Sequence, residues 1–283
     1  MTFQINIGPS FERMAALDPA AVQAGKVLGT VIRPGPLKNA LTGSWLGHPL
    51  HPVLTDVVIG AWGSAWLLDV LGGKKAREAA DQLIGIGILS ALPTAAAGVA
   101  DWLDTTGPTR RVGLVHAAAN VTGLALFTWS YTARKRGRRL SGFALGTLGA
   151  AVASFSAYLG GHLVYRLGTG VNESAFDEAP GEWTAVLSDD ALPERTLTGA
   201  QVGDTPLLLY RTGATVFALS DRCTHRGCLL HEGTIEDASV VCPCHGSTFL
   251  LEDGSIVRGP ATAPQPVYDA RIRDGQIEVR ART

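Results

Sequence analysis

The chain has 283 residues, enough for two domains of ordinary size. Its 24 Lys and Arg residues almost balance its 25 Asp and Glu residues, so the net charge gives no case for binding nucleic acid. Residues 1–180 carry 15 basic and 11 acidic side chains, whereas residues 181–283 carry 9 and 14; with a positive mean hydropathy of +0.17, this split indicates a membrane half followed by a soluble half.

Long uncharged stretches follow one another in the first half. Three of them, of 18, 22 and 26 residues, contain no charged side chain: residues 83–100, 112–133 and 140–165. A fourth apolar stretch, residues 52–71, is interrupted by Asp56 and Asp69. Because about 20 apolar residues cross a bilayer as a helix, the pattern predicts an all-α bundle of four transmembrane helices. Helices buried in a soluble bundle are the alternative interpretation.

The charges of the connecting loops predict how these helices are oriented. The loop after the first span contains Lys74, Lys75 and Arg77, and the loop after the third is the basic run 134–139, whereas the loop between them is neutral. Since basic loops stay in the cytoplasm, both chain ends and the acidic half are expected outside it, in a multi-pass protein of the cell membrane. Residues 1–47 lack the apolar core of a signal peptide and are interpreted as an N-terminal extension.

Four histidines are expected near the outer face of the membrane. His48 and His51 come just before the first span, His116 lies about one turn inside the third, and His162 lies about one turn inside the outer end of the fourth. Ionisable residues inside a membrane are costly and are therefore candidates for function. Two facing histidines could ligate a b-type haem or bind a quinone by hydrogen bonds. Helix capping and contact with interfacial water are the structural alternative.

The membrane half resembles an uncharacterised family of four-helix bacterial membrane domains that are sometimes fused to iron–sulfur modules. The resemblance covers about residues 40–172 and rests on three motifs: Gly47-His48-Pro49-Leu50-His51-Pro52, Asp101-Trp102 and Gly160-Gly161-His162-Leu163-Val164-Tyr165. It implies a membrane domain, here residues 48–167, and no known chemistry. Residues 168–181 are small and polar, and they are interpreted as either a flexible connector or a packed, fixed one.

Short β-type runs replace the long apolar stretches after residue 181. Turn signals such as Thr212-Gly213, Asp253-Gly254 and Asp274-Gly275 separate runs rich in Val, Leu, Ile, Thr and Tyr: residues 206–211, 215–220, 240–241, 255–258 and 276–280. This spacing predicts a small antiparallel β domain over residues 182–283.

All four cysteines fall within 22 residues, which indicates a local metal or redox site. Cys223-Thr224-His225 and, after a sixteen-residue gap, Cys242-Pro243-Cys244-His245 closely resemble the signature of Rieske [2Fe–2S] proteins. The resemblance implies that Cys223 and Cys242 bind one iron, and that His225 and His245 bind the other. The alternative is a zinc site with two cysteines and two histidines, which would not explain the additional cysteine in each loop.

The resemblance also implies roles for the neighbouring residues. The remaining cysteines, Cys228 and Cys244, occupy the positions that form a disulfide in Rieske proteins of the cytochrome bc type; free buried thiols are the alternative. Such a bond would persist in an oxidising compartment, in agreement with the predicted orientation. Gly246, Ser247 and Pro260 are expected to tune the cluster: Ser247 by donating its hydroxyl to a cluster sulfur, and Pro260 from a shielding proline loop at residues 259–264. His231 fits no motif position and is expected at the surface.

These features predict a membrane-anchored Rieske protein that carries one electron from a membrane donor, quinol or haem, to a protein acceptor. Two other functions stay open: a quinol oxidoreductase with a haem or quinone site among His48, His51, His116 and His162, and a ferredoxin-like donor to an oxygenase. No side chain is singled out as catalytic, so a component of an oxidoreductase is expected rather than a stand-alone catalyst. The expected partners are redox proteins of an electron-transport chain, the lipid bilayer and quinone, but not nucleic acid.

Overall fold

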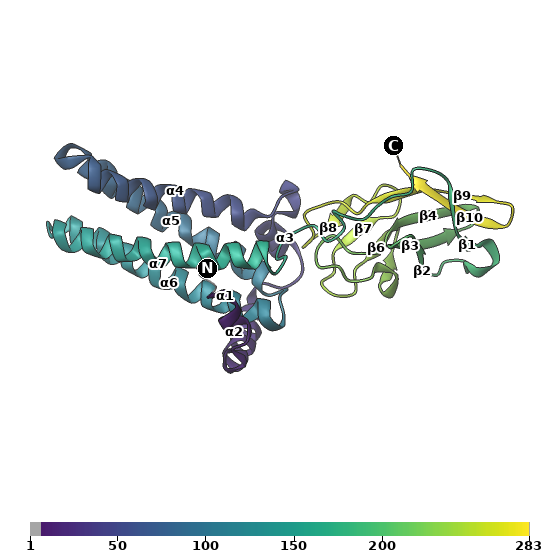
Figure 1. Cartoon of the computed structure of the whole chain (residues 1–283), viewed down its shortest axis with the longest axis horizontal. Helices are drawn as coiled ribbons and strands as arrows, with labels where there is room; N and C mark the ends of the chain where they lie inside the picture. The colour runs from purple at the N-terminus through teal and green to yellow at the C-terminus, as the bar shows by residue number, and fades with distance from the viewer. Residues whose placement is uncertain (1–6, 283) are drawn as a thin grey trace, which may run out of the picture. The chain divides into compact units, whose positions relative to one another are not determined.

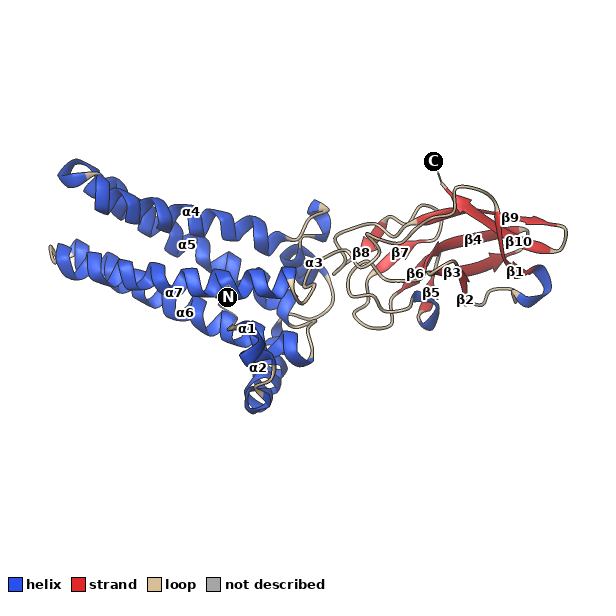
Figure 2. Ribbon diagram, viewed as in Figure 1, coloured by secondary structure: helices blue, strands red, loops and turns tan. Residues whose placement is uncertain are grey.

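The computed structural model describes residues 7–282, which form two compact units (Figure 1). The first unit contains the chain up to Arg33 and residues 50–169, and it is helical. The second contains residues 34–49 and the chain from Gly170 onward, and nearly all of it is β-structure and loops (Figure 2). The chain therefore contributes residues to the β unit from both sides of the helical bundle in sequence.

Four long helices make up the bundle: α4 (Leu50–Leu71), α5 (Arg77–Trp102), α6 (Gly107–Lys135) and α7 (Arg139–Tyr165). Each is long and apolar enough to cross a membrane, with a mean hydropathy of 1.3–1.9 in its best window. The helices contain the four stretches that the sequence predicts to span the bilayer. The prediction of a four-helix bundle is therefore confirmed.

Aromatic and small residues fill the centre of the bundle. The rings of Trp62 on α4 and Phe127 on α6 stack with their centroids 4.0 Å apart. A methyl group on Gly87 of α5 would lie 2.3 Å from the Trp62 indole, and one on Gly149 of α7 would lie 3.1 Å from the Phe127 ring. Small residues let membrane helices pack closely, so these glycines are required where the two rings cross the bundle.

An ion-pair cluster near the basic loops explains Asp69, one of the two charges that interrupt the apolar stretch of residues 52–71. Arg134 of α6 is only 5% exposed and donates to Asp69 of α4 at 2.5 and 2.8 Å and to Asp81 of α5 at 3.3 Å. Arg139, the first residue of α7, donates to both oxygens of Asp81. Buried charges are tolerated when they are paired, and this cluster joins all four helices.

Up to Arg33, the described part of the N-terminal extension is helical and belongs to the same unit as the bundle. It forms α1 (Gly8–Glu12), a short 3₁₀ turn η1 (Ala15–Leu17) and α2 (Asp18–Val31). Asp18 at the start of α2 accepts two hydrogen bonds from Arg111 of α6, at 2.6 and 2.7 Å. These contacts hold the extension against α6.

Ten strands form the β unit, and every strand pair within its two sheets is antiparallel. The six-stranded sheet has the order β1-β10-β9-β4-β3-β2, and the four-stranded sheet has the order β5-β6-β7-β8. Their bounds are β1 Thr184–Ser188, β2 Thr198–Val202, β3 Thr205–Thr212, β4 Thr215–Ser220, β5 Thr234–Glu236, β6 Ser239–Val241, β7 Thr248–Leu250, β8 Ile256–Arg258, β9 Val267–Arg273 and β10 Gln276–Ala281. The predicted antiparallel β domain is confirmed.

The core of the β unit follows from alternation along β3. Successive residues of a strand point to opposite faces of the sheet. Leu207, Leu208 and Leu209 are nevertheless all fully buried, because a core covers each face of β3. Leu208 packs in one core with Phe249 and with the cysteines of both motif loops, whereas Leu207 and Leu209 pack in a second core on the other face. The first core therefore supports the loops that carry the site.

The connector after the bundle packs along the β unit. The Asp177 carboxylate accepts a hydrogen bond from the Ser220 hydroxyl at 2.8 Å, and the Glu178 carbonyl accepts one from Thr205 at 2.9 Å. The amide of Ala281 donates to the carbonyl of Pro180 at 2.7 Å. Of the two interpretations of residues 168–181, these contacts agree with the packed connector from Gly170 onward.

Candidate metal centre

Two loops of the β unit share one design. The first follows β4 and turns at Cys223, and the second follows β6 and turns at Cys242. In each loop a glycine amide four residues later donates to the carbonyl of that cysteine: Gly227 at 2.8 Å and Gly246 at 3.1 Å. Both glycines have a positive φ, +71° and +78°, which glycine adopts without strain. The turn explains why a glycine stands at position 246. It gives Gly227 the same structural role, which sequence analysis missed although Gly227 also follows a cysteine by four residues.

The two loops bring the four predicted ligands together as a sulfur pair and an imidazole pair. Cys223 and Cys242 are both buried, and their thiols are hydrogen-bonded to each other. This bond and burial raise the pKa of Cys223, and the same bond lowers the pKa of Cys242 to about 7. The rings of His225 and His245 lie with their centroids 5.0 Å apart and their planes nearly perpendicular.

The imidazole of His225 is held in its neutral form. Burial lowers its pKa to about 2, and the positive charges of His245, Arg226 and Lys38 lower it in the same direction. Metals bind neutral imidazole and deprotonated thiol. The environment of His225 therefore favours the form of this side chain that binds iron.

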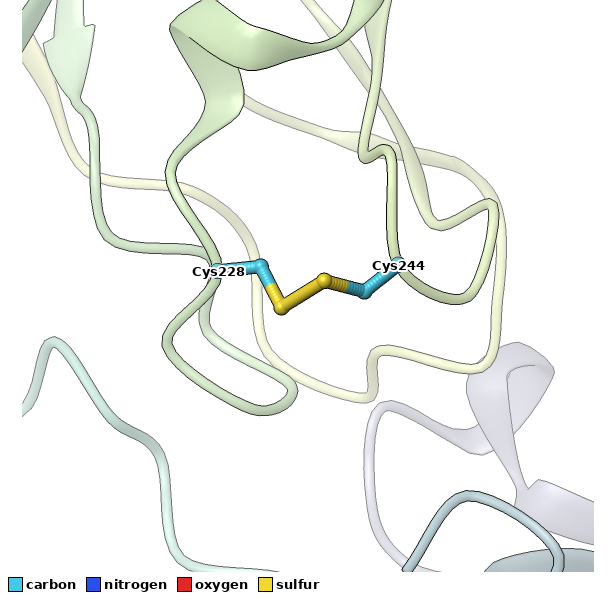
Figure 3. The surroundings of a disulfide bond; sticks show 2 residues. All are labelled: Cys228 and Cys244. Carbon is cyan, nitrogen blue, oxygen red and sulfur yellow. A yellow bond between two sulfur atoms is a disulfide. The ribbon is translucent and has the colours of Figure 1, made fainter.

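A disulfide joins the tips of the two loops (Figure 3). It links Cys228 of the first loop to Cys244 of the second, with the Cα atoms 6.4 Å apart. Cys223 and Cys242 are the free cysteines of the chain. The arrangement is the one that the family resemblance implied, and it fixes the two loops to each other next to the candidate ligands.

The proline loop is hydrogen-bonded to both of these loops. Pro260 is buried and follows a cis peptide bond, and the amide of Ala261 donates to the Ser247 hydroxyl oxygen at 3.0 Å. On the other side, the hydroxyl of Thr224 donates to the Ala263 carbonyl at 2.9 Å. Because Ser247 accepts the bond from Ala261, its own hydrogen is available for a second bond, as the predicted role requires.

Gln265 is a buried residue of the site that sequence analysis missed. Its Nε2 donates to the carbonyls of Ser220 and Arg222, at 2.7 and 2.8 Å, and its Oε1 accepts from the amide of Thr224 at 3.2 Å. One side chain therefore uses its donor and acceptor groups to fix the backbone on either side of Cys223. No spacing rule marks it, because a lone glutamine after a proline-rich loop has no local signature.

His231 keeps 31% of its side chain exposed and is held in place by hydrogen bonds. Its Nδ1 donates to the Asp221 carboxylate at 2.5 Å, and its backbone amide donates to the same carboxylate at 2.7 Å. A methyl group on Gly199 would lie 3.0 Å from its ring. Asp221 is 2% exposed and comes two residues before Cys223, so the pair of His231 and Asp221 stabilises the start of the first loop.

Among the histidines of the bundle, the structure brings His51 and His116 together. Their ring centroids are 6.3 Å apart, one on α4 and one on α6. The Nδ1 of His51 lies 2.9 Å from the Thr94 carbonyl, and the Nδ1 of His116 lies 2.8 Å from the Ser156 carbonyl. Since a carbonyl can only accept, both Nδ1 atoms carry the hydrogen, and both Nε2 atoms are acceptors.

The other two histidines have different neighbours. His162 donates from Nε2 to Glu12 of α1 at 2.7 Å, and a methyl group on Gly8 would clash with its ring at 2.3 Å. His48 belongs to the β unit and is exposed, with its Nδ1 bonded to the carbonyl of the adjacent Pro49. The four histidines therefore form one close pair and two separate residues.

The donor set agrees with a dinuclear cluster rather than with a single zinc ion. Within residues 7–282, no three His, Cys, Asp or Glu side chains gather around one metal position, as a four-ligand zinc site would require. Two thiols and two imidazoles, arranged in separate pairs on matching loops, can each supply two ligands to one of two irons. Such a fold and site define an iron–sulfur electron-transfer domain.

Comparison with known families gives the same result for both halves. Residues 182–269 match the family described as "Rieske [2Fe-2S] domain", and residues 47–173 match "Predicted membrane protein (DUF2231)". The chain belongs to the Rieske [2Fe–2S] family, and its Rieske domain follows a helical domain of the DUF2231 membrane family. The domain binds a [2Fe–2S] cluster, so the zinc interpretation is wrong.

Relatives of the Rieske domain include both of the types considered above. The anthranilate 1,2-dioxygenase ferredoxin subunit of Burkholderia cepacia is 36% identical over 98 residues, 35% of this chain and 91% of that protein. The cytochrome b6-f complex iron-sulfur subunit of Chlorobaculum tepidum is 38% identical over 79 residues, 28% of this chain and 42% of that protein. The solved ferredoxin of carbazole 1,9a-dioxygenase from Nocardioides aromaticivorans IC177 matches 36% of this chain and all of its own length, with 24% identity and a TM-score of 0.34.

Proposed function

We propose that the protein is a membrane-anchored carrier of single electrons, in which Cys223 and Cys242 hold one iron and His225 and His245 hold the other. The observation that carries the proposal is the paired design of the two loops, which presents two thiols and two imidazoles and is closed by a disulfide. When bound, the cluster takes up and releases one electron. Imidazoles in place of two thiolates remove negative charge and favour a potential of roughly −150 to +300 mV.

Electron paramagnetic resonance of the full-length protein in detergent tests this ligand set. After reduction, the wild-type protein is expected to give the spectrum of a reduced [2Fe–2S] cluster with mixed ligands. The variant His245→Asn is expected to lose that spectrum. The matched control is His48→Asn, because His48 is exposed and its Nδ1 bonds the carbonyl of the adjacent residue. An unchanged spectrum in His245→Asn would overturn the assignment.

We infer that the four long helices anchor the protein in the membrane with the Rieske domain outside the cytoplasm. The support is twofold: the basic loops at residues 72–77 and 134–139 fall on one side of the bundle by the order of the helices, and the disulfide suits an oxidising compartment. A protease added to spheroplasts is expected to remove a C-terminal epitope tag and to spare a tag inserted at Gly137. The reverse pattern would refute this orientation.

The acceptor in this proposal is a redox protein outside the cytoplasm, and the donor is quinol or haem in the membrane. The ferredoxin alternative draws on relatives that are subunits of dioxygenases. Mixing the reduced protein with purified electron-transfer proteins separates the two. Rapid oxidation by a periplasmic cytochrome is expected, and oxidation by an aromatic-ring dioxygenase alone would favour the alternative.

A second candidate function, quinol oxidation, rests on the pair of His51 and His116. Both are neutral acceptors at Nε2 by the tautomer argument above, and Asn120 donates from Nδ2 to His116 Nε2 at 3.0 Å. His51 Nε2 can accept from a quinol hydroxyl or ligate haem iron, and His116 Nε2 can do so once it is released from Asn120. His162 is not part of this pair, because its Nε2 donates to Glu12.

A reduced-minus-oxidised absorbance spectrum separates the possibilities at the histidine pair. Haem bands that disappear in the double variant His51→Ala, His116→Ala, and stay in His162→Ala, would support haem ligation. Without such bands, quinol-analogue binding is measured for the same variants. If neither haem bands nor analogue binding depends on the pair, this second function is refuted and the bundle is an anchor.

A further inference from the structure

We propose that the segment Pro34–Pro49 is a working part of the cluster site, and that the positive charge of Lys38 raises the reduction potential of the cluster. Lys38 is then a tuning residue that acts through its charge and is not itself a ligand. The inference rests on the ligand set proposed above. It assigns a role in tuning the cluster of the β unit to a segment that precedes α4, the first long helix, in the sequence.

The segment is part of the β unit. It consists of α3 (Pro36–Thr42), a 3₁₀ turn η2 (Ser44–Leu46) and the residues on either side. Its contact with the proline loop is tight: a methyl group on Gly259 would lie 1.9 Å from the Ser44 hydroxyl oxygen and 3.2 Å from Asn39 Oδ1. Gly259 directly precedes Pro260, so α3 and η2 lie against the loop that shields the cluster.

Lys38 is the neighbour of Asn39 on α3 and is only 4% exposed. It is the one Lys, Arg, Asp or Glu residue of the segment, which therefore brings a net positive charge to this surface. The charge is buried within the segment that packs on Gly259, directly before Pro260 of the loop that shields the cluster. A buried ammonium group also acts more strongly than one in water, since the surrounding dielectric constant is lower.

The direction of the effect follows from the charge of the reaction. Reduction adds one negative charge to the cluster and its ligands, and net charge is one of the factors that set the potential of iron–sulfur clusters. A fixed cation nearby stabilises the reduced form more than the oxidised form. Loss of that cation must therefore lower the potential, whereas its replacement by another cation must preserve it.

The test is a redox titration of the full-length protein in detergent, followed by electron paramagnetic resonance. In Lys38→Met the equilibrium constant for reduction is expected to fall roughly three- to tenfold, where tenfold corresponds to 59 mV for one electron. Lys38→Arg is expected to keep the wild-type potential. The matched control is Arg273→Gln, which removes one exposed positive charge from the hairpin between β9 and β10 of the same unit.

Asn39→Asp provides a second, independent variant. It adds a negative charge at nearly constant shape on the contact with Gly259, and it is expected to lower the potential as well. Asn39→Leu removes the same amide without a charge and is expected to leave the potential near the wild-type value. If Lys38→Met fails to fold, this pair decides the question.

The outcomes separate this inference from the proposed function. A wild-type protein without the cluster spectrum would refute the ligand set itself. A normal spectrum with an unchanged potential in both Lys38→Met and Asn39→Asp would refute only the role of Lys38. A shift that is equally large in Lys38→Arg would mean that packing, and not charge, controls the potential.

Discussion

Gln265 offers the sharpest test of how the cluster loops are held. Its three hydrogen bonds tie the backbone at Ser220, Arg222 and Thr224 to the end of the proline loop, and the side chain is 2% exposed. Gln265→Met keeps the length of the side chain but leaves buried carbonyl and amide groups without this partner. At about 1–3 kcal/mol for each lost bond, the β unit is expected to lose at least about 3 kcal/mol of its free energy of unfolding.

Thermal bleaching of the cluster absorbance measures this loss in the full-length protein. For a unit of this size, 1 kcal/mol corresponds to roughly 3–6 °C, so the bleaching temperature of Gln265→Met is expected to fall by about 10 °C or more. Gln201→Met is the matched control, because Gln201 is exposed on the edge strand β2. If both variants bleach at the wild-type temperature, the three bonds contribute no net stability and the reasoning is refuted.

Three further changes probe other contacts. Ser247→Ala is expected to lower the cluster potential by about 60 mV, because a bond about 1.4 kcal/mol stronger in the reduced state is lost; an unchanged potential in a redox titration would mean that the hydroxyl serves only Ala261. The double variant Cys228→Ser, Cys244→Ser is expected to lose about 3 kcal/mol of stability, and the wild-type protein treated with a thiol reductant should bleach at the same lowered temperature. Arg134→Met removes the main partner of the buried Asp69 and the second partner of Asp81, and it is expected to destabilise the bundle by about 3–5 kcal/mol, measured by circular dichroism during denaturation in mixed detergent; a wild-type midpoint would contradict the pairing.

Features encoded by a few neighbouring residues could be predicted from the sequence. A helix that is long and apolar enough to cross a membrane is marked by its own composition, so all four such helices could be predicted, including the one that contains Asp69. The two motif loops could be predicted for the same reason, because the proposed ligands within each loop are only a few residues apart in the sequence. Even there, Gly227 was missed, although it repeats the offset of Gly246.

Features that depend on which faces of distant segments meet could not be predicted. Asp69 and Arg134 are 65 residues apart in sequence, and only the rotation of α4 and α6 decides that they pair. The same holds for the histidines: equal depth in the membrane did not decide that His116 lies beside His51 while His162 bonds Glu12. The hydrogen bond between His231 and Asp221 could not be predicted either, because neither residue belongs to a motif.

The division of the chain has a consequence for how the protein is made. Residues 34–49 are synthesised before the bundle, yet the unit to which they belong is completed only after residue 170 has been added. The early segment must therefore wait through the synthesis of about 120 residues, and its final docking is a contact of high sequence separation, the kind that forms late in folding. In the proposed membrane-anchored arrangement, both parts must also reach the same side of the bilayer before they can meet. Assembly of the cluster unit thus follows the synthesis of all four long helices.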